Sequence, residues 1–464
     1  MKWETLFSAQ RTGVATDKNR DYDPVRNSFQ KDYDRIIFSS AFRRLQNKTQ
    51  VFPLPGSVFV HNRLTHSLEV ASVGRSLGKA VGEKIAIKNT GDGKHFNEFY
   101  RHELPSVIAS ACLAHDIGNP PFGHSGEDAI RTFFVELEGE IKNKISGSLS
   151  INQLKDFEKF EGNSNALRVL THNYNEPEPG GYRLTYTTLA AIVKYPCSSL
   201  AGFDKSTGLI ATKKSGFFDS EKDTFIQIAK TLHIPAIEKQ ELVFARHPFV
   251  FLTEAADDIC YRVIDLEDAH RLHIITLDTF MGLFLPFFKE EGEEYRTRTY
   301  IEKKVKAIND DNQKVQYVRA LWIGLMTEKL AAVFIENEAA ILNGDMQQDL
   351  LKCLPESDRL LIDEINRFSV KHVYNYRSVV EIEIAGYNII GGLLDKFIHA
   401  VLYPKKSRST KLIQLVSSQF PLQLKEETVY QDVQSIVDFI GGMTDLYAID
   451  MYRKITGITI PEIK

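Results

Sequence analysis

The sequence predicts an all-α protein. Apolar residues recur at three- and four-residue intervals through most of the 464 residues, whereas runs that alternate apolar and polar residues are scarce. Hydrophobic residues make up 43% of the chain, which is enough to bury a large core. No internal repeat or low-complexity tract interrupts the pattern. We therefore expect a helical core over residues 1–280 and a helical C-terminal region over residues 281–464 that completes a pocket.

The first informative helix begins near residue 61. In the segment HNRLTHSLEV, His66 precedes Val70 by one helical turn, so both side chains share one face. Leu77 and Val81 continue that apolar face. A histidine on such a face is usually a satisfied core residue, and alone it predicts only burial.

The most informative segment is AHDIGNPPFGHSGE, which spans residues 114–127. The apolar run SVIASACLA ends in it and predicts a buried helix that delivers His115 and Asp116 to a turn. A buried carboxylate needs a partner. A divalent cation would neutralise Asp116 and accept a neutral imidazole as a second ligand. For an isolated doublet, the alternative is a helix end where both side chains bond the local backbone.

A new helix is expected after this Gly/Pro turn. Ser125 and Asp128 fit an S-x-x-D capping pattern, which puts Glu127 in the first turn and His124 at the helix entrance. The helix dipole alone also favours an acidic residue in a first turn. The position of Glu127 therefore has two compatible explanations.

A third helix is predicted over residues 254–269, EAADDICYRVIDLEDA. Asp257, Tyr261 and Asp265 follow at i, i+4 and i+8 and project from one side. This spacing selects Asp257 over the adjacent Asp258. A histidine, a His-Asp doublet and an aspartate, each on a separate apolar-flanked helix, are hard to attribute to chance.

Three segments rich in turn formers or charge are expected to be loops. They are NTGDGKHFN (residues 89–97), NYNEPEPGGYR (173–183) and YPKKSRSTK (403–411). The mixed-charge run over residues 289–306 is expected to be a solvated helix face with Glu302 and Lys306 paired at i, i+4.

Composition excludes several classes of protein. A formal charge of −4 argues against a generally basic nucleic-acid binder. The four cysteines form no CxxC pair and are typical of reduced thiols in a cytoplasmic protein. The longest apolar stretch, residues 274–288, contains Asp278 and is shorter than the ~20 residues of a spanning helix. The N-terminus lacks the apolar region of a signal peptide, and no GxxxxGK[ST] loop occurs. We expect a cytoplasmic enzyme.

Several separated blocks resemble one family. The order His66, His115, Asp116, Asp257 is similar to the H…HD…D metal site of the HD phosphohydrolase superfamily. The blocks DRIIFSSAFRRLQNKTQVF, FEGNSNALR, KYP, KKSGFF and EAADDICY closely resemble the deoxyguanosinetriphosphate triphosphohydrolase (dGTPase) family, and a weaker similarity continues at EIEIAGYNIIGGLLD. The matching blocks run in one order from near the N-terminus to about residue 270.

The resemblance implies a metal-dependent hydrolase. Two imidazoles and two carboxylates suit Mg or Mn, and also Fe, Co or Ni, whereas the absence of thiolate argues against structural zinc. Such an ion lowers the pKa of a bound water and draws charge from a phosphoryl oxygen. The implied reaction is attack at the α-phosphorus of dGTP or another dNTP, which releases a deoxynucleoside and inorganic triphosphate.

The resemblance also implies roles for individual residues. His124 and Glu127 are the implied catalytic pair, with Glu127 orienting the imidazole. Gln50 and Asp265 would hold the 3′-hydroxyl, and Tyr261, or less directly Tyr387, would exclude a 2′-hydroxyl. The implied contacts to the triphosphate are Arg63, Asn163, Arg168, Lys194 and Lys214. Homo-oligomers, hexamers among them, and regulation by a nucleotide or single-stranded DNA are further implications.

Two other functions stay open at this point. One is another HD phosphohydrolase, acting on nucleoside monophosphates or on cyclic or hyperphosphorylated nucleotides, which the DRIIFSSAFRRLQ and KKSGFF blocks disfavour. The other is a non-catalytic nucleotide sensor or single-stranded nucleic-acid binder, which the complete set of ligands disfavours. The base preference among dNTPs is also open.

Overall fold

Helices dominate the structure, and the described part of the chain has no β-strand beyond isolated bridges. The structure is a computed structural model that describes residues 1–14, 26–52, 60–89, 93–174, 178–237 and 242–459. The prediction of an all-α fold is confirmed.

The helices that precede residue 272 carry all the predicted metal ligands. They are α1 (Ser28–Phe38), α2 (Ser40–Arg44), α3 (Arg63–Lys88), α4 (Gly93–Glu98), α5 (Leu104–Ala114), α6 (His124–Val135), α7 (Gly139–Ser148), α8 (Ile151–Glu158), α9 (Gly162–Thr171), α10 (Tyr186–Ile192), α11 (Lys222–Thr231) and α12 (Pro248–Arg271).

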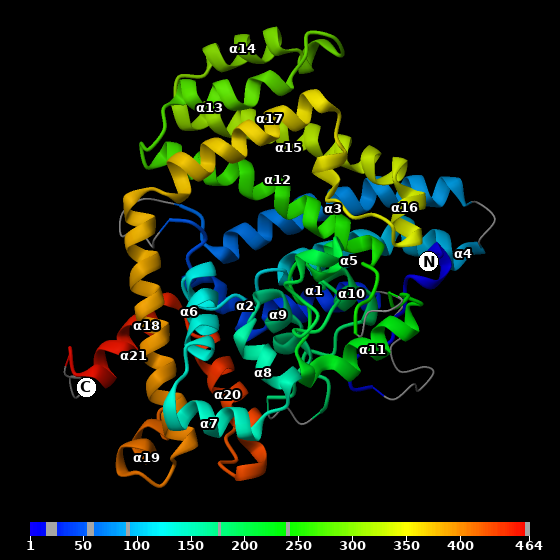
Figure 1. Ribbon diagram of the computed structural model, residues 1–464. Coiled ribbons are helices and arrows are strands. Elements are labelled where there is room, and N and C mark those ends of the chain that lie inside the picture. Colours follow the sequence, from blue (N-terminus) through cyan, green and yellow to red (C-terminus); the bar gives the residue numbers. More distant parts are fainter. Residues whose placement is uncertain (15–25, 53–59, 90–92, 175–177, 238–241, 460–464) are drawn as a thin grey trace.

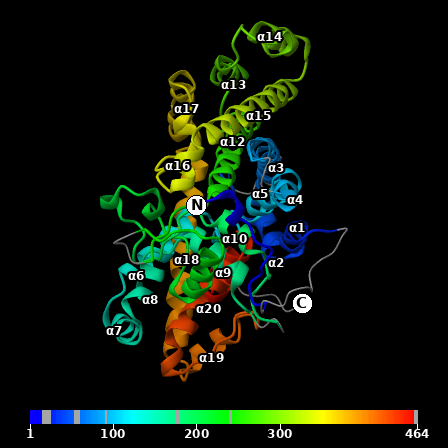
Figure 2. The ribbon, with the colours of Figure 1, turned by 90° about the vertical axis from the view of Figure 1, so that its right-hand side faces the viewer.

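The helices after residue 272 form two groups at opposite ends of the molecule (Figures 1 and 2). One group is α13 (Leu277–Phe284), α14 (Arg298–Ala307), α15 (Asp311–Glu336), α16 (Glu338–Asn343) and α17 (Glu356–Ser369). The long helix α18 (Arg377–Leu402) connects it to the second group, which is α19 (Ser407–Ile413), α20 (Val429–Gly441) and α21 (Asp445–Thr456).

Short helical turns complete the described secondary structure. The 3₁₀ turns are Trp3–Thr5, Leu45–Asn47, Lys205–Thr207, Ile210–Thr212, Asp219–Glu221, Leu285–Phe287, Glu294–Arg296, Leu350–Cys353 and Glu426–Thr428. Two π-helical turns, Phe99–Glu103 and Val370–Tyr374, precede α5 and α18.

Helices α3 and α5 pack against each other through a face of small residues on α3. A Cβ atom at Gly74 would lie 2.4 Å from Sγ of Cys112 on α5. A Cβ atom at Gly82 would lie 2.0 Å from the carbonyl oxygen of Tyr100. Only glycine leaves room for the side chain of Cys112 at the first position and for the backbone of Tyr100 at the second. This contact fixes the separation of the two helices that carry His66 and His115.

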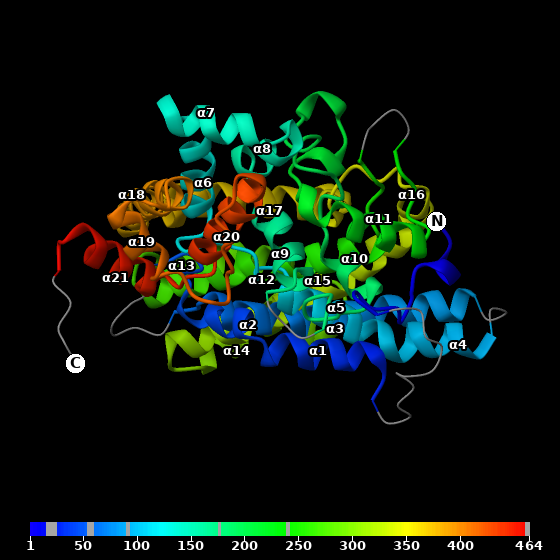
Figure 3. The same ribbon diagram turned by 90° about the horizontal axis from the view of Figure 1, so that it is seen from below.

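Two large hydrophobic clusters form most of the core of the described residues, beside a small third one around Cys197, Ala211 and Val243. The first lies around α3, α5, α12 and α15, and the second around α6, α8, α18 and α20. Viewed from below, α7 and α8 lie on one side and α1 on the opposite side, with α20 between them (Figure 3). The segment that follows α5 contributes Ile117 to the first cluster and Phe122 to the second. The C-terminal helices α18 and α20 therefore pack in the same core as this segment. The boundary near residue 280 stays a prediction.

Two of the three expected loops contain helix. Residues 93–98 form α4 and residues 407–413 form α19, because Phe96 and Leu412 bury their side chains against the core and stabilise the turn. Residues 90–92 and 175–177 of the expected loops lie outside the described ranges. In α14, Glu302 pairs with Arg298, four residues before it, at 2.9 Å. The expected pairing with Lys306, four residues after it, is wrong.

The four cysteines are free thiols, and three of them are buried. The prediction of unpaired cysteines is confirmed. Within the described ranges, none of the helices combines the length and the apolar character needed to cross a membrane.

Candidate metal centre and catalytic cleft

The four predicted metal ligands come from three helices that contact one another, α3, α5 and α12, whose ribbons Figure 1 shows. His66 lies in the first turn of α3, where Asn62 and Thr65 form a capping box that fixes the start of the helix. His115 and Asp116 follow the last residue of α5. Asp257 lies in the middle of α12. The four ligands thus come from elements whose positions are set by the buried core.

The four side chains lie within a ligand shell of one another. The ligating atoms of His66, His115 and Asp116 are all within 4.8 Å of one another. Asp257 lies outside that three-residue group, but its Oδ1 is 3.0 Å from Nε2 of His66 and 3.5 Å from Nε2 of His115. Asp258 points elsewhere and pairs with Arg262 at 3.0 Å.

The donor set suits a divalent cation. Nδ1 of His115 lies 2.6 Å from the carbonyl oxygen of Cys112, and since a carbonyl can only accept, Nδ1 carries the proton. In the neutral ring Nε2 is then the atom free to bind a cation, and it lies 3.6 Å from Asp116 and 3.5 Å from Asp257. Such a second bond is usual for a metal-binding histidine because it fixes the ring and its tautomer.

The carboxylates are held in the charged form that a metal requires. Burial opposes ionisation of Asp116, but Arg63, His115 and His66 outweigh it and lower its pKa to about 2. Burial also opposes ionisation of Asp257, and the two imidazoles again outweigh it and hold its pKa well below the usual range. Both groups are acceptors at any pH near neutrality.

The turn after Asp116 has a strained backbone. Phe122 and Gly123 both have positive φ angles, of 63° and 57°. A Cβ atom at Gly123 would lie 2.6 Å from Nη2 of Arg63, so glycine is needed here for its conformation and for space. Gly123 is the N-cap of α6 and no side chain caps the helix. The expected cap at Ser125 is therefore wrong, because the turn brings His124 into the helix as its first residue.

His124 and Glu127 form the predicted pair. Nδ1 of His124 lies 3.0 Å from Oε2 of Glu127, which is almost fully buried. The other oxygen of Glu127 accepts a hydrogen bond from the backbone N–H of Gly162 at 2.9 Å. The hydrogen bond to Glu127 raises the pKa of His124 against the opposing effect of burial. The imidazole thus lies at the cleft with its charged form favoured.

A cleft of about 790 Å³ joins the ligands and most predicted substrate residues. Each predicted phosphate-binding cation in it has a carboxylate partner. Arg63 pairs with Asp116 at 2.7 Å, Lys194 with Glu254 at 3.0 Å, and Lys214 with Glu161 at 2.9 Å. Asn163 also donates to Glu161, at 2.7 Å. These pairs hold long side chains in place at the cleft wall.

The predicted sugar-binding residues line the same cleft. Oε1 of Gln50 is buried and has no hydrogen-bond partner in the described part of the chain. Asp265 accepts a hydrogen bond from the hydroxyl of Tyr374 at 2.8 Å, and burial raises the pKa of Asp265 to about 7. The ring of Tyr261 stacks under the guanidinium of Arg262 at 4.5 Å.

Two predicted substrate residues are not among the described residues that line the cleft. Arg168 is 2% exposed and pairs with Asp438 at 2.7 Å and Glu221 at 2.9 Å. It follows Asn163 by five residues, which turns it by about 140° around α9 and away from the cleft. Tyr387 is 38% exposed on α18. The structure does not bring these two together with the others.

Sequence reasoning missed several residues that position the site. Asp445 of α21 accepts hydrogen bonds from the backbone N–H of Thr49 at 2.9 Å and of Phe122 at 3.0 Å. It thereby holds the segment before Gln50 and the turn before His124. Asn119 donates to Oδ1 of Asp116 at 2.5 Å. Asn119 lies inside the informative motif and could have been found, whereas no local pattern points to Asp445.

Comparisons with known proteins find two family models and several relatives that match this chain. The family model of the HD domain matches residues 63–195, and that of the phosphohydrolase-associated domain matches residues 353–454. A deoxyguanosinetriphosphate triphosphohydrolase-like protein of Synechocystis is 37% identical over 99% of this chain and all of its own length. The like-named protein of Listeria monocytogenes is 36% identical with the same coverage. The deoxyguanosinetriphosphate triphosphohydrolase of Yersinia pseudotuberculosis is 31% identical over 97% of each chain.

Proposed function

The chain belongs to the deoxyguanosinetriphosphate triphosphohydrolase-like family of HD-domain phosphohydrolases, and from this membership we propose that it hydrolyses dGTP. Water attacks the α-phosphorus, the bond to the 5′-oxygen breaks, and deoxyguanosine and inorganic triphosphate leave. The observation that carries the proposal is the meeting of four metal-ligand side chains beside His124 and Glu127 in one cleft.

The charge of the cleft supports dependence on a metal. Its lining holds more carboxylates than lysine and arginine side chains, and the three best-placed cations are already paired. A triphosphate would be repelled by this wall unless a cation offsets it. His66, His115, Asp116 and Asp257 would hold Mg or Mn. When bound, the metal would supply Lewis acidity and an activated water.

His124 is suited to proton transfer. Its Nδ1 proton is directed at Glu127, which leaves Nε2 for the substrate. The hydrogen bond to Glu127 raises the pKa of His124 and so favours the protonated imidazole. In that form Nε2–H donates a hydrogen bond to the reacting phosphoryl group and a proton to the departing 5′-oxygen.

The remaining lining residues orient the substrate. Lys194, Lys214 and Asn163 lie where they can exchange part of their carboxylate contacts for phosphate oxygens. Gln50 and Asp265 offer acceptors or donors to the 3′-hydroxyl, and the ring of Tyr261 limits space beside the sugar. The C-terminal region contributes Tyr374, Val379 and Glu383 to the wall, which supports its proposed role in completing the pocket.

Product analysis tests the reaction. The purified protein is incubated with dGTP and Mg or Mn in water labelled with heavy oxygen. The products are separated by chromatography, and their molecular masses are measured. Deoxyguanosine without label and triphosphate with one labelled oxygen are expected. Formation of dGMP and diphosphate, or the absence of products, would contradict the proposal. Parallel reactions with dATP, dCTP, dTTP and GTP measure base and sugar preference.

A further inference from the structure

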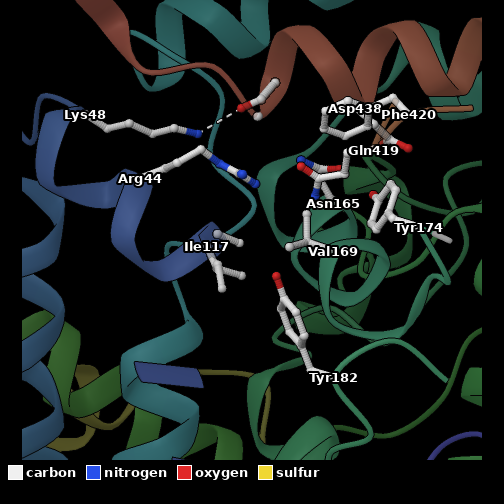
Figure 4. Close-up of a pocket in the computed structure, with 13 residues that line it drawn as sticks. Arg44, Lys48, Ile117, Asn165, Val169, Tyr174, Tyr182, Gln419, Phe420 and Asp438 are labelled. Carbon is white, nitrogen blue, oxygen red and sulfur yellow. Dashed lines mark hydrogen bonds between the residues drawn. The ribbon is translucent and has the colours of Figure 1, made fainter. Parts of the chain in front are cut away.

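A second cavity lies behind the turn that follows Asp116, between α2, α9 and α20 (Figure 4). None of the residues that line it also lines the catalytic cleft. The side chains of Arg44 and Lys48 enter it from one side, and Asn165, Tyr174 and Tyr182 lie across from them. Its volume of about 20 Å³ corresponds to one or two water positions, so it cannot take a nucleoside.

Arg44 has no charged partner in the described ranges. No hydrogen bond or ion pair joins its half-buried guanidinium to another described residue, although this group carries five N–H donors. Burial lowers the pKa of Arg44, because removal of the guanidinium from water disfavours its charged form. The carboxylate at the cavity wall, Asp438, does not offset that charge, because both of its oxygens accept from Arg168.

Lys48 adds a second cation. It is 3% exposed, and its Nζ donates to the carbonyl oxygens of Asn119 at 2.5 Å and Gly441 at 2.8 Å (Figure 4 shows the second bond). An ammonium group has three donors, so one is left without an acceptor in the described structure. Burial and the nearby Arg44 lower the pKa of Lys48 to about 7.

We propose that this cavity binds one small inorganic anion, no larger than phosphate, between the guanidinium of Arg44 and the ammonium of Lys48. Both cations then gain the acceptor that they lack, and a guanidinium fork matches the oxygens of such an anion. The inference does not depend on the proposed function, because binding is measured without turnover.

The bound anion is connected to the metal centre. Lys48 bonds the backbone of Asn119, and the side chain of Asn119 bonds Oδ1 of Asp116. The same ammonium bonds Gly441 at the end of α20. Occupation of the cavity would therefore hold the turn after Asp116 against the C-terminal helices and raise the unfolding temperature.

Arg44→Gln and Arg43→Gln are a matched pair of variants, since the two arginines are neighbours on α2 and only Arg44 lines the cavity. Binding of radiolabelled inorganic phosphate to the full-length protein is measured by equilibrium dialysis with chelator present. Unfolding temperatures are measured in phosphate and in chloride at equal ionic strength. Arg43→Gln should behave as the unchanged protein, and Arg44→Gln should lose one binding site or weaken it by about tenfold or more.

The proposal is overturned if the two variants bind phosphate equally and gain equally in unfolding temperature from chloride to phosphate, while both show the helical circular dichroism of the unchanged protein. If Arg44→Gln does not fold, Arg44→Lys retains the charge and should bind phosphate, with a lower affinity because the fork is lost. Absence of binding by Arg44→Lys would also overturn it. A crystal structure determined in phosphate gives an independent measurement, in which density for the anion is expected within hydrogen-bond distance of Arg44 and its absence contradicts the proposal.

Discussion

The catalytic cleft and the Arg44 cavity both bury charge, but they balance it in opposite ways. In the cleft, Arg63, Lys194 and Lys214 each have a carboxylate within 3.0 Å, and further carboxylates are left over. In the cavity, Arg44 has no carboxylate partner among the described residues. The two regions lie on either side of the turn after Asp116. The excess charge of each site therefore indicates the ligand that it would bind, which is a cation in the cleft and an anion in the cavity.

The largest expected effect comes from removing a carboxylate of the cleft. Asp116→Ala leaves the cation without one ligand and leaves Arg63 without its partner. We expect loss of bound manganese, measured by electron paramagnetic resonance, and a fall in turnover of more than about 100-fold.

Asp258→Asn is the matched control, because Asp258 pairs with Arg262 and not with the imidazoles. It should retain manganese. If Asp258→Asn removed the metal and Asp257→Asn did not, the assignment of the fourth ligand would be wrong.

The next effect concerns the proton that His124 carries. Since Glu127 raises the pKa of His124, and the reaction uses the protonated ring, activity should fall as the pH rises through that pKa. In Glu127→Gln the pKa of His124 is lower, so the alkaline limb of the kcat profile should move to lower pH. His124→Ala should lower kcat by about 10²-fold or more while metal binding is retained. An unmoved alkaline limb in Glu127→Gln would show that His124 does not donate the proton.

A smaller effect is expected from Asp445, the carboxylate that holds two backbone segments of the cleft wall. Asp445→Ala leaves the backbone N–H groups of Thr49 and Phe122 without an acceptor, which should destabilise the protein by roughly 1–3 kcal/mol in urea unfolding. Turnover should fall as well, because the turn before His124 loses a fixed point. Asp450→Ala on the same helix breaks only an exposed pair with Lys454 and should cost less than about 1 kcal/mol. If both variants lost the same free energy of unfolding, Asp445 would not be the residue that holds the two backbone segments.

The smallest expected effect is a change in how stability depends on pH. Burial raises the pKa of Asp156 to about 7, against hydrogen bonds from the hydroxyl of Tyr430 and the backbone N–H of Asp219. The folded protein keeps a proton that the unfolded chain releases above about pH 4. The stability that this proton contributes is therefore complete below about pH 4 and is lost as the pH rises through about 7. In Asp156→Asn the unfolding temperature should fall less between about pH 4 and about pH 7. An unchanged dependence of the unfolding temperature on pH would contradict the raised pKa of Asp156.

Local sequence patterns predicted the parts of the site that lie on regular helices. The spacing of His66 to Val70 and of Asp257 to Asp265 fixes a helical face, and the structure places both in one cleft. Helical phase also explains the misplacement of Arg168, because a residue five positions after Asn163 cannot share its direction. The turn at Phe122 and Gly123 could not be predicted in this way, since its positive φ angles depend on contacts with distant segments.

The contributions of the C-terminal helices were beyond sequence patterns. Lys48 meets Gly441, and Thr49 meets Asp445, across nearly the whole length of the chain. Each partner is a backbone group or a single carboxylate with no local motif. Such contacts follow from the packing of α20 and α21, and no periodicity along the chain encodes them.

The glycine face of α3 has a consequence for evolution of the metal centre. Gly82 already meets the backbone of Tyr100, and Gly74 meets the side chain of Cys112, so this face has no room for a further carbon atom. A single added methyl group could only spread the helices. Substitution of Gly82 would therefore displace α3, with His66 in its first turn, from the helix that precedes His115 and Asp116, and mutations at this face are constrained by a site that they do not touch.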